Sequence, residues 1–342
     1  MRKLYALIFV FCLSFFAFSQ SIQFISSRTG DPLPDITVFN SSGDIVATSD
    51  IDGKILKKNL MPFTGDYTLY DKDYKIGVLQ PQDVDNSLIK LNDKVYRIQP
   101  VVIQNQTNSK YLYLSGFFIS FVTVNGKLTA YTDGEVISVF DNRSKKFQND
   151  FVKQFRTYII HNPEASETKA LADNNQRSNL RIPSFEILGQ YSATKQKDKT
   201  SDLLEFSRSD YDIVEWKEAR FEDKEFKFLG YRVTDMKATN TLLYRKGSAK
   251  LLRDLHEISQ EESSKLKHKS ETDYNNMVVY SYFYPQKITF GDERKLEGVR
   301  FITAWSDYET KYWEQEGFPD KKKVFDSFFA KNLVLLQNIR TP

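Results

Sequence analysis

Short apolar runs alternate with turn residues throughout residues 23–103, and this spacing constrains the fold more than any other feature of the chain. A tight turn at residues 40–43 separates two such runs, and the next turn ends in Gly53, which is free to adopt a positive φ. Further runs follow at regular intervals. The pattern predicts about seven short strands in a small antiparallel β-sandwich over residues 20–103.

The residues around these turns resemble those of a known family. Three short stretches carry the resemblance. They are Arg-Thr-Gly-Asp-Pro-Leu-Pro-Asp-Ile-Thr-Val at residues 28–38, Ala-Thr-Ser-Asp at residues 47–50 and Asp-Gly-Lys at residues 52–54. This series resembles the carboxypeptidase-regulatory-like, transthyretin-like domain of exported Bacteroidetes proteins. In that family the module is a transthyretin-like, Ig-like β-sandwich that accompanies receptors, peptidases and uncharacterised envelope proteins. The resemblance therefore implies a fold and an envelope location, and it implies no particular activity.

The chain opens with a predicted secretory signal peptide, residues 1–19. A basic end precedes an uncharged apolar stretch that closes with the small residues Ala17 and Ser19. The stretch is shorter than the roughly 20 residues of a membrane-spanning helix, so an N-terminal anchor is the less favoured alternative. Cleavage after Ser19 removes Cys12, the only cysteine, and with it any disulfide. We expect a periplasmic or outer-membrane-associated protein, with full secretion as the alternative.

Composition excludes some classes of partner. Without the two basic residues of the leader, the formal net charge falls from +3 to +1. The chain therefore lacks the large net positive charge that would attract nucleic acid. The hydrophobic content of 40% is compatible with packed cores, and no segment after the leader has the length and apolarity of a transmembrane helix. We expect neither nucleic-acid binding nor a later membrane span.

A polar stretch at residues 104–110 predicts a linker, and residues 111–342 predict an α+β domain of unknown function. This domain begins with a three-stranded meander over residues 116–140, with turns at Asn125-Gly126 and at Asp133-Gly134. The whole chain is therefore predicted to be mainly β, with an antiparallel sheet and flanking helices in its second part.

Three helices are predicted from apolar spacings of three and four residues. They cover residues 147–159, residues 248–258 with Ser248 as the N-cap, and a last helix opened by Pro319-Asp320. Between the first two, the polar residues 164–200 predict an irregular excursion around a short apolar piece. Further strands are predicted at residues 226–234, 239–245, 277–284, 287–290 and 299–305.

No motif predicts a catalytic residue, a metal site or a cofactor. The chain contains no Gly-x-Ser-x-Gly elbow and no glycine-rich phosphate loop. His161 is expected to lie at the end of a helix, where its side chain suits the exposed carbonyls. His256 and His268 lack metal-ligand spacing and are expected to be solvated. The Asp50-x-Asp52-Gly53 series fits a hairpin better than a calcium loop.

Carboxylates are plentiful, and a glycoside hydrolase needs only two across a sugar bond. Examples are Glu215, Glu218, Glu222 and Asp223, but their spacing in sequence does not establish such a pair, and an ordinary solvated surface is the favoured interpretation.

Four aromatic residues, Trp305, Tyr308, Tyr312 and Trp313, are the candidate ligand-binding residues. Together they could form a platform on which a sugar, a lipid or a peptide stacks. The favoured interpretation is that strand alternation places half of the aromatic residues in the core and the others at an interface.

The second domain also resembles other uncharacterised exported proteins with the same N-terminal module. The resemblance lies in Thr-Asp-Gly-Glu-Val at residues 132–136, followed by Lys-Gln-Phe-Arg at residues 153–156. No function accompanies it. We expect a non-enzymatic envelope protein that binds a ligand or an assembly partner, which would be an envelope protein, a glycan or a lipid. The alternative is a hydrolase of envelope glycans or peptides whose catalytic residues the sequence does not identify.

Overall fold

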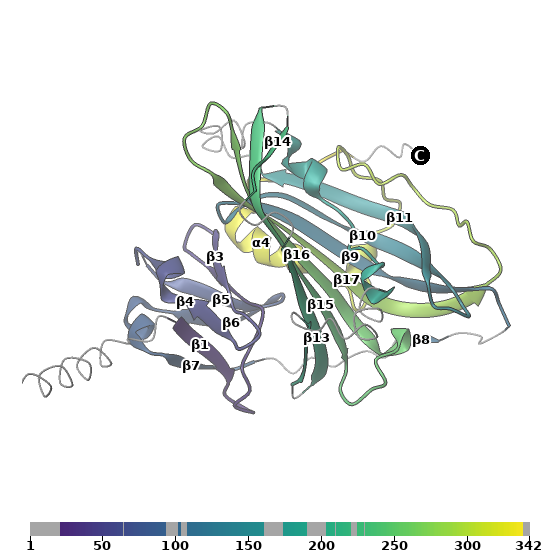
Figure 1. Cartoon of the computed structure of the whole chain (residues 1–342), viewed down its shortest axis with the longest axis horizontal. Helices are drawn as coiled ribbons and strands as arrows, with labels where there is room; N and C mark the ends of the chain where they lie inside the picture. The colour runs from purple at the N-terminus through teal and green to yellow at the C-terminus, as the bar shows by residue number, and fades with distance from the viewer. Residues whose placement is uncertain are drawn as a thin grey trace, which may run out of the picture. The chain divides into compact units, whose positions relative to one another are not determined.

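The structure is a computed structural model that describes residues 21–63, 65–93, 102–103, 108–160, 174–189, 203–208, 210–219, 224–228 and 230–337. The predicted signal peptide, most of the predicted linker and His161 lie outside the described residues. The chain divides after residue 94 into two compact units (Figure 1). Among the described residues, no helix has the length and apolarity to cross a membrane.

The first unit contains two small sheets that enclose one apolar core. One sheet has the order β4-β1-β7 and the other the order β3-β2-β5-β6. Ile22 and Phe24 of β1 face Val38 and Leu69 of the second sheet within this core, and all four are fully buried. The strands are β1 Ser21–Ser26, β2 Ile36–Phe39, β3 Ile45–Thr48, β4 Lys54–Leu56, β5 Tyr67–Asp71, β6 Tyr74–Leu79 and β7 Leu88–Leu91.

The Asp-x-Asp-Gly series closes a hairpin through its own backbone. Asp50 Oδ1 accepts hydrogen bonds from the amides of Asp52 and Lys54, at 3.0 and 2.8 Å. Gly53 has φ 72°, and a Cβ there would lie 2.4 Å from the carbonyl oxygen of Phe24. Glycine is therefore required for two reasons: the backbone has a positive φ, and the neighbouring strand β1 leaves no room for a side chain.

The second unit is dominated by an eleven-stranded sheet in the order β12-β13-β15-β16-β17-β9-β10-β11-β18, with β14 paired to β15 and β8 to β17. Apart from the parallel β8, the pairings are antiparallel. The strands are β8 Val102–Ile103, β9 Tyr111–Val124, β10 Lys127–Asp141, β11 Phe147–Ile160, β12 Leu203–Ser207, β13 Tyr211–Ala219, β14 Phe226–Phe228, β15 Tyr231–Arg245, β16 Leu255–His268, β17 Asn275–Gly291 and β18 Leu333–Leu335. The predicted mainly β fold is confirmed.

Side-chain alternation gives this sheet two faces. The inner face carries Leu114, Phe118, Val136, Phe155 and Phe283, which belong to one buried apolar cluster. Residues 180–188 and the segment 299–305 cover this face. The outer face carries the residues between them in sequence, and α4 (Lys321–Phe329) packs there. In the part of the chain that the structure describes, the short 3-10 helices are η1 Lys57–Leu60, η2 Pro81–Asp85, η4 Asn174–Asn179, η5 Leu252–Asp254 and η6 Tyr312–Glu314.

Helix α4 confirms the last predicted helix. The side chain of Asp320 accepts a hydrogen bond from the amide of Lys323, at 3.2 Å, as an N-cap does. Phe325 inserts between Phe121 and Tyr131 of the outer face, with ring centroids 5.0 and 5.9 Å away.

The other two predicted helices are wrong. Residues 147–159 form β11, whose pairing with β10 shifts register twice, between Glu135 and Val136 and between Val139 and Phe140. Each β-bulge inserts a residue and breaks the period of two, so apolar residues fall at spacings that imitate a helix. Residues 248–258 form η5 and the start of β16, which continues to His268 instead of fraying. A further register shift between Leu243 and Tyr244 disguises the alternation in the same way.

Several predicted strand boundaries also change. The pairs of strands predicted at residues 226–245 and 277–290 are each joined into one long strand, β15 and β17, with the short β14 beside β15. The strand predicted at residues 299–305 is an irregular segment, attached to β11 by single bridges at Val299 and at Asp307.

Asp212 on β13 gives a prediction about acid stability. Its buried carboxylate accepts hydrogen bonds from Ser207 Oγ at 2.5 Å and from the Gly247 amide at 2.8 Å. The Ser207 bond, more than any other group, lowers the pKa of Asp212 below its ordinary value. Its stabilising effect is therefore present at neutral pH and is lost as the pH falls below about 4. We expect Asp212→Asn to lower the free energy of unfolding at pH 7 by about 1 to 3 kcal/mol. In urea titrations, the difference from the wild type should shrink towards pH 2, and a constant difference would contradict the assignment.

Candidate functional site

Two polar sequence phrases, residues 132–136 and 153–156, lie side by side on β10 and β11. The register places Asp133 opposite Arg156 and Glu135 opposite Gln154, and all four side chains point to the outer face. The phrases therefore describe one structural unit of two cross-strand polar pairs.

Asp133 and Arg156 form a buried bidentate ion pair. Arg156 Nε and Nη2 donate to the Asp133 carboxylate at 2.9 and 2.7 Å, and the side chains are 0% and 6% exposed for Asp133 and Arg156 respectively. Burial alone would lower the pKa of Arg156, but the neighbouring carboxylate outweighs it, so the pKa lies above its ordinary value. The Arg156 guanidinium therefore keeps its positive charge beside this carboxyl group.

Two of the four predicted aromatic residues, Tyr312 and Trp313, contact this ion pair, and a third packs on Trp313. Tyr312 Oη donates to the carboxylate and to the backbone oxygen of Asp133, at 2.5 and 2.9 Å, and burial raises its pKa. The Trp313 ring lies 3.9 Å from the Arg156 guanidinium, and Tyr308 meets Trp313 edge-to-face. Trp305 lies apart from them, packed against the inner-face cluster. Its buried Nε1 has no hydrogen-bond partner among the described residues. Tyr312 is 0% exposed, so its ring offers no surface for stacking.

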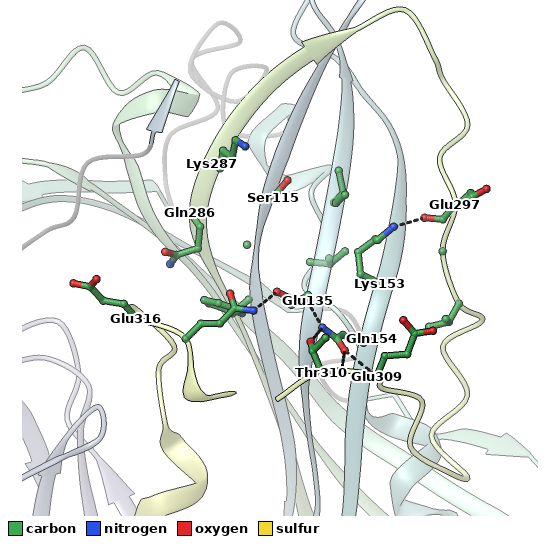
Figure 2. A pocket seen from close by; sticks show the side chains of 17 residues that line it. Ser115, Glu135, Lys153, Gln154, Gln286, Lys287, Glu297, Glu309, Thr310 and Glu316 are labelled. Carbon is green, nitrogen blue, oxygen red and sulfur yellow. Dashed lines mark hydrogen bonds between the residues drawn. The ribbon is translucent and has the colours of Figure 1, made fainter. Parts of the chain in front are cut away.

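Gln154 joins the sheet to the segment that follows Asp307. Its Nε2 donates to Glu135 at 2.5 Å and to Thr310 Oγ1 at 2.7 Å, and its Oε1 accepts from the amides of Glu309 and Thr310, both at 3.1 Å. Gln315 Nε2 donates to the other oxygen of Glu135, at 3.2 Å. Figure 2 shows that these bonds form a continuous chain from the strand to the segment. Residues 309–316, which we call the wall, are thus fixed to β10 and β11.

The wall and the sheet enclose a pocket of about 690 Å³. Its floor crosses β17, β9, β10 and β11, and its other side is formed by residues 297–299. Six charged residues line it: Glu135, Lys153, Lys287, Glu297, Glu309 and Glu316 (Figure 2). The volume lies within the range of about 300 to 1,000 Å³ typical of small-molecule sites.

Local backbone features shape this pocket. Register shifts occur beside it on β10, between Glu135 and Val136, and on β17, between Pro285 and Lys287. Such bulges redirect side chains, and they are frequent next to binding sites. Gly298 allows the segment 297–299, which forms the other side of the pocket, to lie close to β11. A Cβ at this position would lie 2.8 Å from the carbonyl oxygen of Val152.

The remaining candidates lie elsewhere. His268 is buried, and its Nδ1 lies 2.7 Å from Ser270 Oγ, so the expectation that it is solvated is wrong. His256 stacks on Tyr211. Glu215 lies 3.5 Å from Lys217, and Glu218 accepts a bond from Trp216, whereas Glu222 and Asp223 lie outside the described residues. In the part of the chain that the structure describes, no group of three His, Cys, Asp or Glu residues could hold a metal ion.

Sequence reasoning missed Glu135, Gln154 and the wall as parts of a site. The available signal was the pair of phrases at residues 132–136 and 153–156, which carry their polar residues at matching positions. Because residues 147–159 were predicted as a helix and Asp133-Gly134 as a turn, the two phrases could not be aligned as neighbouring strands.

Comparisons with known proteins add little to this geometry. No protein-family model and no curated protein matches the chain. A solved structure described by its lipid–protein interactions in lipovitellin is similar at a TM-score of 0.29 and 8% identity, over 59% of this chain. The match spans 27% of that structure's chain, and a similarity this low carries no argument about function. Fold and site together define a mainly β protein with a preformed polar pocket.

Proposed function

We propose that the chain is an exported envelope protein whose second unit binds a small polar ligand, a glycan fragment, without catalysing its conversion. The observation that carries this proposal is the pocket, whose wall Gln154 ties to the sheet. A pocket fixed before binding avoids the cost of ordering a loop around the ligand.

The lining favours a ligand that is rich in hydroxyl groups. Carboxylates of Glu135, Glu297 and Glu309 provide acceptors, and Lys153 and Lys287 provide donors. A sugar hydroxyl both donates and accepts, so it matches this mixture. An extended peptide usually binds by adding a strand to a sheet edge. A peptide cannot add a strand to β9 or β10 on the pocket floor, because each of these strands is already paired on both sides.

The envelope location rests on the predicted leader and on the resemblance of residues 28–54 to the transthyretin-like module. In this proposal the first unit is the accessory module and the second unit holds the ligand site. Mass spectrometry of the protein from its native envelope should find an N-terminus at Gln20. A chain that retains Met1 in the cytosol would contradict the export proposal.

Binding is tested by calorimetric titration of a chain that begins at Gln20 with soluble oligosaccharides released from bacterial envelope glycans. We expect Gln154→Ala to weaken binding about tenfold, because the wall loses several hydrogen bonds of roughly 0.5 to 1.5 kcal/mol each. Gln148→Ala, on the same strand but outside the pocket lining, is the matched control and should bind as the wild type does. Equal affinities for the two variants would rule out the pocket as the site.

A glycoside hydrolase is the second candidate, because four carboxylates line one pocket and the reaction needs two. Chromatography of the same oligosaccharides after incubation distinguishes the two functions. Unchanged oligosaccharides support binding alone. Shortened products that disappear with Glu135→Gln or Glu309→Gln would establish the hydrolase instead.

A further inference from the structure

Basic side chains gather on the outer face of the large sheet, at the end formed by β14, β15 and β16. Lys227 of β14 is paired directly with Arg232 of β15, and Arg232 is paired with Lys267 of β16. Directly paired residues point to the same face of a sheet, so these three cations form one row across three neighbouring strands. Lys267 is an even number of residues from Glu261, which the pairings align with Phe121, where α4 packs. The row therefore lies on the outer face.

Two further lysines extend this row along the strands. Lys265 is two residues before Lys267 on β16, and Lys237 of β15 is paired with Ser263, two residues earlier again. Their side chains point to the same face, because alternation along a strand has a period of two. The side chains of Lys227, Arg232 and Lys265 are 67%, 43% and 54% exposed, so a ligand in solution can reach them. We call the five side chains the cationic face: Lys227, Arg232, Lys237, Lys265 and Lys267.

Acidic residues offset only part of this charge. Glu225 lies 3.3 Å from Lys227 and 3.6 Å from Arg232, and Asp235 lies 2.7 Å from Lys265. Within the described ranges, these are the two carboxylates that form ion pairs with the cationic face, so three positive charges remain in excess. Like charges directly opposite each other on neighbouring strands destabilise a sheet. The row therefore lowers the stability of the sheet, and an anion bound across it would offset that loss.

Nearby contacts hold the row in place without using all of its hydrogen-bond donors. Lys267 Nζ donates to the backbone oxygen of Thr272 at 3.0 Å and lies 4.5 Å from the centroid of the Tyr274 ring. Tyr274 Oη donates to Glu225 at 2.5 Å, which fixes this carboxylate beside the cations of β14 and β15. A guanidinium has five N–H donors and an ammonium has three. The cations can therefore bind a further anion while Glu225 stays in place.

The surroundings of the cations favour an acidic polymer in solution over a membrane or a nucleic acid. The positions paired with Lys265 on the two neighbouring strands carry Thr234 and Asn276. These polar side chains offer no apolar surface for insertion into a bilayer. Nucleic acids bind without sequence preference largely by stacking on exposed aromatic rings, whereas the ammonium of Lys267 covers the ring of Tyr274.

From these observations we infer that the cationic face binds an acidic polysaccharide through the carboxylate groups of the polymer. Neighbouring strands are about 4.8 Å apart, so the row presents cations at short, regular intervals to a chain with many acidic groups. The site is separate from the polar pocket. Gln286 of the pocket follows Asn276 by ten residues on β17, which corresponds to about 33 Å along the strand. The inference is therefore independent of the proposed binding of a small glycan fragment.

The test measures the binding of fluorescently labelled polygalacturonate, a polysaccharide of carboxylate sugars, to a chain that begins at Gln20. We expect saturable binding that weakens about tenfold when NaCl is raised from about 50 to about 300 mM, because salt screens exposed charges. Neutral dextran should bind about tenfold more weakly, or not at all. Lys227→Gln with Arg232→Gln should weaken polygalacturonate binding about tenfold, because two charge-assisted contacts are lost. The matched control is Lys145→Gln with Lys146→Gln, which removes the same charge from exposed lysines between β10 and β11 and should change the affinity less than about twofold.

A variant with the opposite effect separates binding from a structural role of these residues. Glu225→Gln removes a carboxylate that repels the polymer, so the affinity should rise about threefold. Gln154→Ala should bind polygalacturonate as the wild type does, which distinguishes this site from the pocket. Cooperative thermal unfolding shows that each variant is folded. Equal affinities of the double variant at the cationic face and its control would overturn the inference. Tighter binding to phosphatidylglycerol vesicles or to single-stranded DNA than to polygalacturonate would overturn it as well.

Discussion

Replacing Arg156 with methionine is expected to lower the free energy of unfolding by about 3 to 5 kcal/mol, because it leaves the Asp133 carboxylate charged, buried and without its partner. Tyr312 still donates to that carboxylate but cannot neutralise it. Equilibrium unfolding in guanidinium chloride measures the effect. Fluorescence of Trp313, which lies on the guanidinium, reports the local change.

A double-mutant cycle separates two free-energy terms: the interaction energy of the ion pair, and the cost of leaving one charge buried without its partner. Asp133→Asn combined with Arg156→Met removes both charges, so the double variant should be less destabilised than the sum of the two single variants. Lys153→Met removes a cation from an exposed position of the same strand and should change stability by about 0.5 kcal/mol or less. Strict additivity of the two single effects would contradict a coupled ion pair.

Gly134→Ala is expected to have the second large effect. A Cβ at this position would lie 2.4 Å from the carbonyl oxygen of Gln154 and 2.5 Å from the Phe118 ring. Since the first contact is with backbone, β10 and β11 must separate, and we expect a loss of about 3 kcal/mol or more in the free energy of unfolding.

Separation of these strands would also misalign both cross-strand pairs, so Gly134→Ala should lose affinity for the pocket ligand. Gly189→Ala is the control, because a Cβ there meets no atom within 4 Å. Thermal unfolding of the two variants gives the comparison. A Gly134→Ala protein as stable as the control would show that the strands do not approach as closely as described.

The parts of the fold that depend on local patterns were predictable from the sequence. Turn chemistry located the Asn125-Gly126 hairpin between β9 and β10, and Asp320 marked the start of α4. The failures came from bulges: the register shift between Glu135 and Val136 gave the apolar residues of β11 the spacing of a helix. Bulges are set by how two strands fit together, and a single strand's sequence does not reveal that fit.

Gly134 illustrates the same limit for the site. After Asp133 it has the composition of a turn, yet it lies within the continuous strand β10, where the ring of Phe118 occupies the space of a side chain. The predicted aromatic group is partly brought together, because Tyr312 and Trp313 lie at Arg156 and Tyr308 packs on Trp313. Their partner on β11 could not be identified while that segment was predicted to be a helix. The role of the aromatic group in ligand stacking stays a prediction.

Hydrogen–deuterium exchange at the wall tests most directly whether the polar pocket exists before any ligand binds. The amides of Glu309 and Thr310 should exchange slowly in the wild type, because both donate to Gln154 Oε1, and should exchange at least tenfold faster in Gln154→Ala. Fast exchange of both amides in the wild type, unchanged by the substitution, would mean that the wall is not fixed to the sheet and that no preformed pocket is available to a ligand.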